Sequence, residues 1–280
     1  LQESKLYGVE IDDISGRISK QLYQKAQINI CGFEETKFAD NFFDIAIGNV
    51  PFGDIKVFDR DYNKHNLNIH DYFFIKSIDK LKVGGILAFI TSKGTLDKLN
   101  PNVRKMMAEK ADFLGAVRLP NTAFKDVAGT DATSDIIFLQ KREELSLDEP
   151  SWLNTSIDEN GLVLNNYFIE NPDMILGEMV IDERRKGMYG EGSKVTTCIN
   201  TDPDFNLKDS LKTALKNIKA EIKTIDIDNS EITDGLNIDL EDILLNNDFD
   251  NYSYQNIHNE AFFYSNGSLE RFNGSEDKKK

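Results

Sequence analysis

The chain contains few of the residues that build disulfide frameworks or metal sites. Its 280 residues include two cysteines and three histidines. Cys31 and Cys198 lie far apart, with no CxxC pair and no histidine cluster near them, so the pattern indicates neither a disulfide scaffold nor a zinc site. The histidines His65, His70 and His258 are scattered and lack catalytic or metal-ligand spacing. We therefore expect a protein of a reducing compartment with no metal in its site.

Long apolar runs are absent too. No run approaches the roughly 20 residues that a helix needs to cross a bilayer, and no charged-then-apolar secretion signal opens the chain. Apolar residues make up 40% and charged residues 29%, the balance of an ordinary globular protein. We expect a cytoplasmic protein with no membrane segment. The first residue is Leu1 rather than methionine, which indicates a processed product or a piece of a longer polypeptide.

The charge balance is acidic, with a net charge of −15. Phosphate contacts need lysine and arginine, so this charge argues against a chain that wraps nucleic acid along its whole length. Basic residues nevertheless gather between residues 90 and 125, and two interpretations stay open: a binding surface, or a solvated face with interspersed acids. The group consists of Lys93, Lys98, Arg104, Lys105, Lys110, Arg118 and Lys125.

Residues 1–142 alternate β-branched runs with helical patterns, which predicts an α/β domain with a parallel sheet covered by helices. The run from Phe43 to Gly48 is nearly all apolar, as in a strand buried on both faces. Predicted strands cover 5–11, 28–33, 43–48, 86–90, 113–119 and 136–140, and predicted helices cover 14–23, 71–81 and 100–111.

Beyond residue 142 the periodicity weakens. Residues 143–225 predict an irregular extension that holds one helix at about 208–225. Residues 226–280 are acidic and asparagine-rich, with apolar residues too sparse for a second large core, so we expect a partly disordered tail.

The most informative segment is Asn49-Val50-Pro51-Phe52, which follows the predicted buried strand directly. Ligands bind beyond the carboxyl ends of strands in open α/β sheets. Asn49 offers a side-chain carbonyl, Val50 a backbone carbonyl, Pro51 a fixed turn and Phe52 an aromatic face for a flat base. The plainer interpretation is a common Asn-x-Pro turn with Phe52 in the core.

The chemistry that suits this segment is transfer to an exocyclic amine. The lone pair of adenine N6 is delocalised into the ring, so the amine is a poor nucleophile. Two fixed acceptors that hold both amine hydrogens favour a pyramidal nitrogen, and both hydrogen bonds strengthen as positive charge develops. The base has to leave the DNA stack first, and an aromatic ring partly replaces the lost stacking.

The segment resembles the Asn-Pro-Pro-(Tyr/Phe) motif of amino-methyltransferases, above all the adenine-N6 DNA methyltransferases, and the resemblance covers about residues 1–142. It implies a Rossmann-like sheet with helices on both faces, the cofactor S-adenosylmethionine and double-stranded DNA as the substrate. It also implies that Glu10, followed by Ile11, holds the ribose hydroxyls. Phe33 would pack on the adenine ring of the cofactor, and Glu34 or Glu35 would meet its amine. Phe124 is similarly a candidate for the target-base pocket.

Three further stretches strengthen one resemblance within this family. Gly-Asn-Val-Pro-Phe-Gly-Asp, Ile-Thr-Ser-Lys-Gly-Thr-Leu-Asp and Arg-Leu-Pro-Asn look like the methylase part of large methylase–helicase proteins of mobile elements, which suggests a restriction-modification context. The chain has no GxxxxGK[ST] sequence, so we expect any helicase region elsewhere in the parent polypeptide.

The chain departs from the family pattern in two places. Val50 replaces the first proline of the motif, although its backbone carbonyl survives, and no glycine-rich loop precedes Glu10. The family's first strand is therefore missing, and that strand lies between the second and the fourth. Either residues 5–11 pair directly with 43–48, or the sheet opens with unpaired edges. We expect the full protein to supply this strand, and the chain alone to bind cofactor weakly.

The alternatives differ in target and in class. The same motif occurs in methyltransferases that act on RNA or on a protein glutamine. A methyltransferase-like module that has lost catalysis and serves as a scaffold or DNA-binding part is the alternative outside enzymes.

Overall fold

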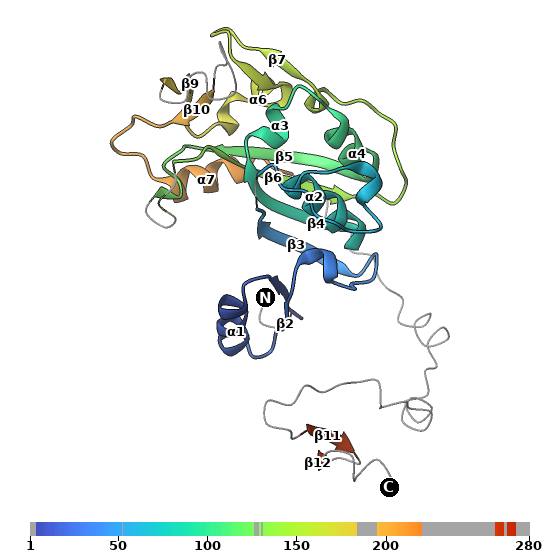
Figure 1. Ribbon diagram of the computed structural model, residues 1–280. Helices are drawn as coiled ribbons and strands as arrows, with labels where there is room; N and C mark the ends of the chain where they lie inside the picture. The colour runs from blue at the N-terminus through green and yellow to red at the C-terminus, as the bar shows by residue number, and fades with distance from the viewer. Residues whose placement is uncertain are drawn as a thin grey trace. The chain divides into compact units, whose positions relative to one another are not determined.

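The computed structural model describes residues 4–51, 53–125, 129, 131–183 and 195–219, and the strands 261–265 and 268–272. The chain divides into two compact units, Leu1–Thr224 and Ile225–Lys280. In the second unit the described residues form one antiparallel hairpin of β11 (Ala261–Ser265) and β12 (Ser268–Phe272). The rest of the predicted tail lies outside the described residues. The first unit holds the sheets and helices discussed below (Figure 1).

The main sheet of the first unit has four strands in the order β3-β4-β6-β5. Strand β3 (Phe43–Asn49) runs parallel to β4 (Leu81–Ser92). Strand β6 (Ser134–Lys141) runs antiparallel to β4 and to β5 (Ala111–Leu119), and it separates them. The predicted α/β class is confirmed, with a mixed rather than a wholly parallel sheet.

A second, parallel pair consists of β1 (Tyr7–Glu10) and β2 (Gln27–Ile30), joined by helix α1 (Asp13–Leu22). Asp12 begins this helix because its carboxylate accepts a hydrogen bond from the backbone N–H of Ser15. The ring of Tyr7 meets the ring of Phe43 edge-on, with 5.3 Å between centroids. The starts of β1 and β3 are therefore held together by aromatic packing, although the two strands are in different sheets.

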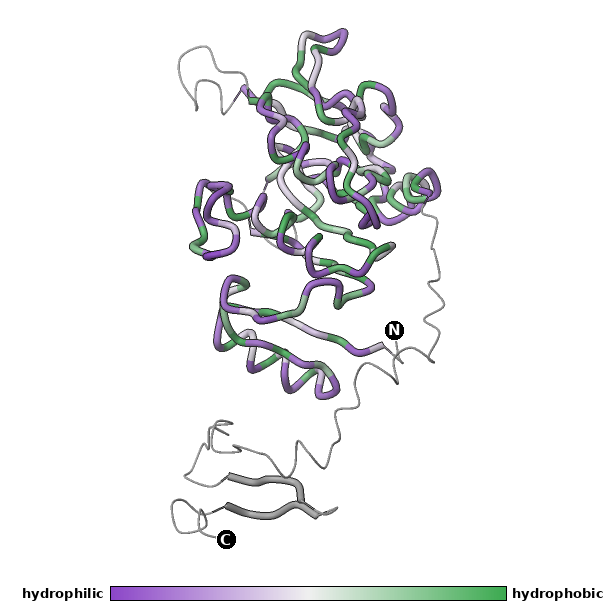
Figure 2. Tube along the Cα trace, turned by 90° about the vertical axis from the view of Figure 1, so that its right-hand side faces the viewer, coloured by the Kyte–Doolittle hydropathy of each residue, from purple (hydrophilic) through white to green (hydrophobic). Residues whose placement is uncertain are grey.

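Of the two arrangements predicted for the missing strand, the structure shows the unpaired edges. Within the described chain, β3 bonds to β4 alone and β1 to β2 alone. The predicted burial of residues 43–48 on both faces is wrong, because Ile45 and Ile47 are 60% and 74% exposed. Too little of the described chain covers this end of the sheet. Along α1, hydrophobic residues alternate with hydrophilic ones (Figure 2), and Ile14 and Ile18 are also exposed.

The core lies around β4, β5 and β6. Helix α2 (Ile69–Lys80) buries Phe74, Ile75 and Ile78, and the ring of Phe74 lies 5.3 Å from that of Phe89 on β4. Helix α3 (Gly94–Asp97) follows β4, and α4 (Asn102–Lys110) packs beside α2. Pro101 precedes α4, where its missing N–H costs least. The predicted helices 71–81 and 100–111 are confirmed within two residues at their ends.

The extension after residue 142 contributes to the same core. Trp152 stacks on Phe113 of β5 with 4.5 Å between ring centroids, and Phe168 and Met174 are buried. The last helix of the extension, predicted over 208–225, ends at Leu215, and residues 220–225 of that prediction lie outside the described residues. The elements are η3 (Ser151–Leu153), β7 (Thr155–Ile157), β8 (Val163–Asn165), α6 (Asn166–Glu170), η4 (Pro172–Met174), β9 (Glu178–Ile181), β10 (Thr196–Ile199) and α7 (Leu207–Leu215).

Candidate functional site

The predicted Asn-Val-Pro segment lies at the carboxyl end of β3. Asn49 is the last residue of the strand, stands opposite Ile90 of β4 and is exposed. The N–H of Val50 donates to the carbonyl of Ile90 at 3.0 Å, and the Val50 side chain is buried in the main core. Pro51 is exposed, and Phe52 lies outside the described residues. The backbone at Val50 is thus anchored, while the Asn49 amide is open to a ligand.

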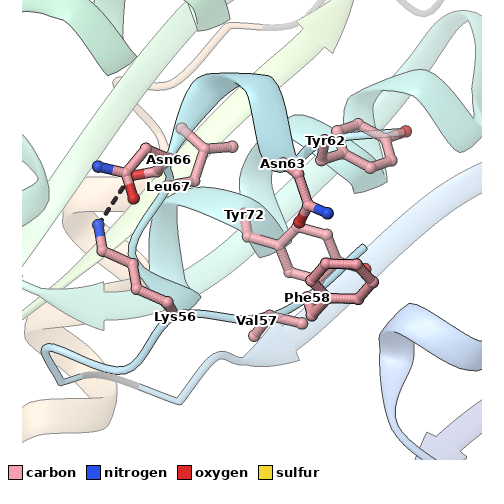
Figure 3. Close-up of a pocket in the computed structure, with 8 residues that line it drawn as sticks. All are labelled: Lys56, Val57, Phe58, Tyr62, Asn63, Asn66, Leu67 and Tyr72. Carbon is pink, nitrogen blue, oxygen red and sulfur yellow. Dashed lines mark hydrogen bonds between the residues drawn. The ribbon is translucent and has the colours of Figure 1, made fainter. Parts of the chain in front are cut away.

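The loop that follows this segment returns to the start of α2. The backbone N–H of Ile69 donates to the carbonyl of Ile55 at 2.9 Å. The ammonium of Lys56 donates to the carbonyl of Asn66 at 2.7 Å, which closes the loop across its base (Figure 3). A short helix, η2 (Asn63–His65), forms the return.

This loop and α2 enclose an open pocket of about 300 Å³. Figure 3 shows the ring of Tyr72, a residue of α2, beside Phe58. That ring, of Tyr72, lies 5.9 Å from the ring of Phe33, so the pocket borders the turn after β2. The lining residues are Lys56, Val57, Phe58, Tyr62, Asn63, Asn66, Leu67 and Tyr72.

The residues predicted to hold a cofactor lie at the ends of β1 and β2. Glu10 ends β1, and its Oε1 accepts a hydrogen bond of 2.9 Å from the backbone N–H of Asp12. Ile11 is 76% exposed. Phe33 begins η1 (Phe33–Glu35) directly after β2, and Glu34 is the next residue. The paired strands therefore bring the four predicted contact residues to one edge, with Glu10 and Ile11 at the end of β1 and Phe33 and Glu34 after β2.

The turn after β2 is tightly folded. A Cβ atom at Gly32 would overlap the carboxylate of Glu34, so the acidic side chain lies back over the glycine. The ring of Phe33 packs at 4.9 Å from that of Phe73 on α2. The glycine leaves room for the Glu34 carboxylate in this position, and the turn presents an acidic group beside an aromatic ring.

A buried lysine joins this turn to the loop after β3. The Lys76 ammonium donates to the carbonyl of Phe33 at 2.7 Å and to Oδ2 of Asp59 at 2.9 Å. Burial raises the pKa of Asp59, but hydrogen bonds from Tyr72, Lys76 and the backbone of Asp61 outweigh it and hold the pKa below its ordinary value. The sequence pattern missed this group, because 17 residues separate its two charges. A lysine within an otherwise apolar helix face was the available signal.

A second buried polar group lies at the start of α2. Nε2 of His70 lies 3.2 Å from Oδ1 of Asp71, and the Lys98 ammonium donates to Oδ2 of Asp71 at 3.0 Å. Nδ1 of His70 is buried and has no hydrogen-bond partner among the residues that the structure describes. Burial lowers the pKa of His70, an effect that Asp71 opposes and Lys98 reinforces, so the imidazole is held neutral at pH 7. Spacing along the chain had indicated no role for His70.

The basic group between residues 90 and 125 does not form a free binding surface. Arg104 and Arg118 are 1% and 0% exposed. Arg118 holds Asp135 through two hydrogen bonds of 2.8 Å and lies 2.9 Å from Asp97. The ammonium of Lys93 donates to Thr196. The remaining lysines are paired with acids, in the pairs Lys98–Asp71, Lys105–Glu149, Lys110–Asp79 and Lys125–Asp131. The interspersed acids of the second interpretation are present, but its solvated face is not, because Arg104 and Arg118 are buried.

The remaining predicted residue lies apart from the others. Phe124 is half-buried in a turn after β5 and packs against the main core. Two strands, β4 and β6, separate β5 from β3 in the sheet, so the structure does not bring Phe124 next to Asn49 through strand pairing. In the described part of the chain, no group of three His, Cys, Asp or Glu side chains could hold a metal ion. No helix there is long and apolar enough to span a membrane.

Comparison with known proteins finds a similarity over the first part of the chain. Residues 3–124 match the family model described as Eco57I restriction-modification methylase. The predicted resemblance to DNA methylases is thereby confirmed over this part of the chain.

One curated relative is much longer than this chain. Defense against restriction protein B of Escherichia phage P1 is 29% identical over 191 residues, which make up 66% of this chain and 8% of that protein. The chain therefore spans less than a tenth of the length of this relative.

Solved structures give weaker likenesses. The M protein of the type I restriction enzyme EcoKI matches with a TM-score of 0.41 and 12% identity, over 76% of this chain and 58% of that one. A chain of a type I restriction-modification assembly matches with a TM-score of 0.42 and 18% identity, over 85% and 52%.

Proposed function

We propose, from the restriction-modification methylase match over residues 3–124, that this chain carries the catalytic part of a DNA methyltransferase that acts on N6 of adenine. The observation that carries the proposal is the placement of Asn49 and Val50. The exposed amide of Asn49 and the anchored backbone N–H of Val50 lie at the carboxyl end of β3, next to β4.

The proposed role of these two residues is to accept the hydrogens of the target amine. The side-chain carbonyl of Asn49 would take one N–H and the backbone carbonyl of Val50 the other. The N–H of Val50 is bonded to Ile90, which holds the Asn49–Val50 peptide in place; the Val50 carbonyl belongs to the next peptide, which leads to Pro51. Pro51 restricts the backbone that follows. Electrostatic catalysis requires acceptors that are in place before charge develops on the nitrogen, and the anchored N–H of Val50 supports this proposed role.

The proposed cofactor is S-adenosylmethionine, which supplies a methyl group on a sulfonium sulfur. The residues at the ends of β1 and β2 fit its adenosine half. Carboxylates such as those of Glu10 and Glu34 accept from hydroxyl and amine donors, and Phe33 offers an aromatic face. The Glu34 carboxylate already lies against Gly32, so a larger residue at that glycine would remove the acidic group from the turn.

The substrate proposed is double-stranded DNA, in the cytoplasm. A helicase region of the same parent polypeptide is the proposed partner. We also propose that a parallel strand from outside the described residues completes the sheet between β1 and β3. The unpaired edges of both strands and the exposed Ile45 and Ile47 support this completion, because an apolar strand edge left open invites pairing.

The test is a transfer assay with radiolabelled S-adenosylmethionine on DNA, RNA and protein, run with this chain and with a longer parent. Asn49→Ala should lower kcat on adenine-containing DNA by about 10²–10³-fold, the usual loss for one such hydrogen bond. Asn160→Ala, which changes an exposed turn asparagine, is the matched control. Label in RNA or protein alone would reassign the target. Unchanged transfer by Asn49→Ala would refute the catalytic role, and no transfer by the longer parent would favour a scaffold.

A further inference from the structure

Lys76 is a lysine buried in the core of a methylase-like domain. This residue of α2 is 3% exposed. A buried ammonium is costly unless it is paired and hydrogen-bonded. Its three N–H donors match three acceptors, the carbonyl of Phe33 at 2.7 Å, Oδ2 of Asp59 at 2.9 Å and the hydroxyl of Tyr72 at 3.0 Å. The ammonium therefore has one fixed position.

The acceptors come from separate parts of the chain. Phe33 belongs to the turn after β2, and Asp59 belongs to the loop after β3 that also forms the pocket of Figure 3. Tyr72 belongs to α2 itself, and its hydroxyl donates to Asp59 at 2.7 Å. One side chain thus connects the cofactor-side turn with the loop that leaves the Asn49 segment.

Phe33 is held by Lys76 at two points. Its carbonyl accepts from the Lys76 ammonium, and its ring centroid lies 4.8 Å from the same atom. The carbonyl also accepts from the backbone N–H and the hydroxyl of Thr36, which closes η1. Loss of the ammonium would remove the cation beside the ring and one of the three hydrogen bonds that the carbonyl accepts, and so loosen the turn that carries Glu34.

We infer that Lys76 is a positioning residue that holds the Phe33–Glu34 turn in the geometry that receives the adenosine half of the cofactor, an inference that rests on the proposed function. If Lys76 only stabilised the fold, its ion pair with Asp59 would be sufficient. Neutral side chains at both positions would then replace that pair without loss of function. Neutral side chains at residues 76 and 59 would not replace the hydrogen bond from Lys76 to the Phe33 carbonyl.

The test uses three variants of the full chain. Lys76→Met removes the ammonium and leaves Asp59 buried without a cation, so it also lowers stability. Lys76→Met combined with Asp59→Asn removes both charges and keeps an acceptor for Tyr72, which restores stability without restoring the bond to Phe33. Lys80→Met is the control, since Lys80 lies one turn further along α2 and pairs with the exposed Asp40.

The readouts are amide hydrogen exchange at Glu35 and Thr36 and calorimetric titration with S-adenosylmethionine. In both Lys76 variants we expect exchange at Thr36 to be about tenfold faster or more, and cofactor affinity to fall about 10–100-fold, the scale of a misplaced binding group. Lys80→Met should change neither.

Recovery of affinity together with stability in the double variant would overturn the inference, as would unchanged exchange at Thr36. The unsubstituted chain could bind no S-adenosylmethionine while Lys76→Met still speeds exchange at Thr36. That outcome would refute the proposed cofactor site and leave the hold of Lys76 on the turn established.

Discussion

The buried arginine of β5 gives the sharpest prediction for stability. Arg118 is 0% exposed, bonds twice to Asp135, lies 2.9 Å from Asp97 and stacks its guanidinium 4.2 Å from the ring of Phe168. Arg118→Met keeps the apolar stem but takes from two buried carboxylates the cation that pairs with them directly, leaving Lys93 as a more distant one. Breaking a buried pair in this way costs about 3–5 kcal/mol, out of a total stability of roughly 5–15 kcal/mol.

The pH dependence of this loss has a definite sign. Burial raises the pKa of Asp135, and Arg118 opposes that rise. Without the guanidinium the folded-state pKa lies further above the unfolded value, so the folded variant binds more protons than the unfolded chain between these two values. Its stability therefore falls as pH rises through that window. The deficit of Arg118→Met should be larger at pH 7 than near pH 4.

The assay is urea denaturation followed by circular dichroism at both pH values. The matched control is Arg17→Met, because the Arg17–Asp13 pair spans 3.7 Å between side chains that are 74% and 71% exposed. Such exposed pairs contribute little to stability, so Arg17→Met should have the same free energy of unfolding as the unsubstituted chain. A deficit below about 1 kcal/mol at pH 7, or an equal deficit at both pH values, would refute the view that an unpaired buried charge dominates.

Two further predictions concern the open end of the sheet and the cysteines. Ile47→Lys should change the free energy of unfolding by less than about 0.5 kcal/mol, because Ile47 is 74% exposed. Ile78→Ala should lower it by about 2–5 kcal/mol, because Ile78 is 0% exposed. The midpoints of urea denaturation of the two variants test both values. Burial raises the pKa of Cys198 to about 12 and raises that of the half-buried Cys31 less strongly. Iodoacetamide at pH 8 should therefore modify Cys31 first, and faster labelling of Cys198 would contradict its burial.

The buried ion group of Arg118 also shows how the extension is attached. Asp97 follows β4, Asp135 lies on β6, and Phe168 comes from the extension after residue 142. Asp97 Oδ1 accepts from the backbone N–H of Asn165, so the same carboxylate side chain contacts both parts. Polar contacts as well as apolar packing thus join the extension to the sheet.

Several features of this protein were determined by local sequence. Alternation of apolar runs with helical patterns predicted the strands and helices of residues 1–142, because burial in a sheet or on a helix face requires those periods. The Asn49-Val50-Pro51-Phe52 segment was predicted to follow a strand, and the structure ends β3 at Asn49. The family resemblance likewise put Glu10 and Phe33 at strand ends; Glu10 ends β1, whereas Phe33 follows β2 as the first residue of η1.

The tertiary structure decided what depends on distant partners. Apolar content predicted burial for Ile45 and Ile47, but burial needs a neighbouring element, and little of the described chain covers that side of the sheet. Lys76 and Arg118 read as ordinary surface charges in the sequence. They are buried because carboxylates 17 residues away in each case are brought to them by folding. A local sequence pattern determines which face of a helix or strand is apolar, whereas only tertiary packing determines which carboxylate pairs with which cation.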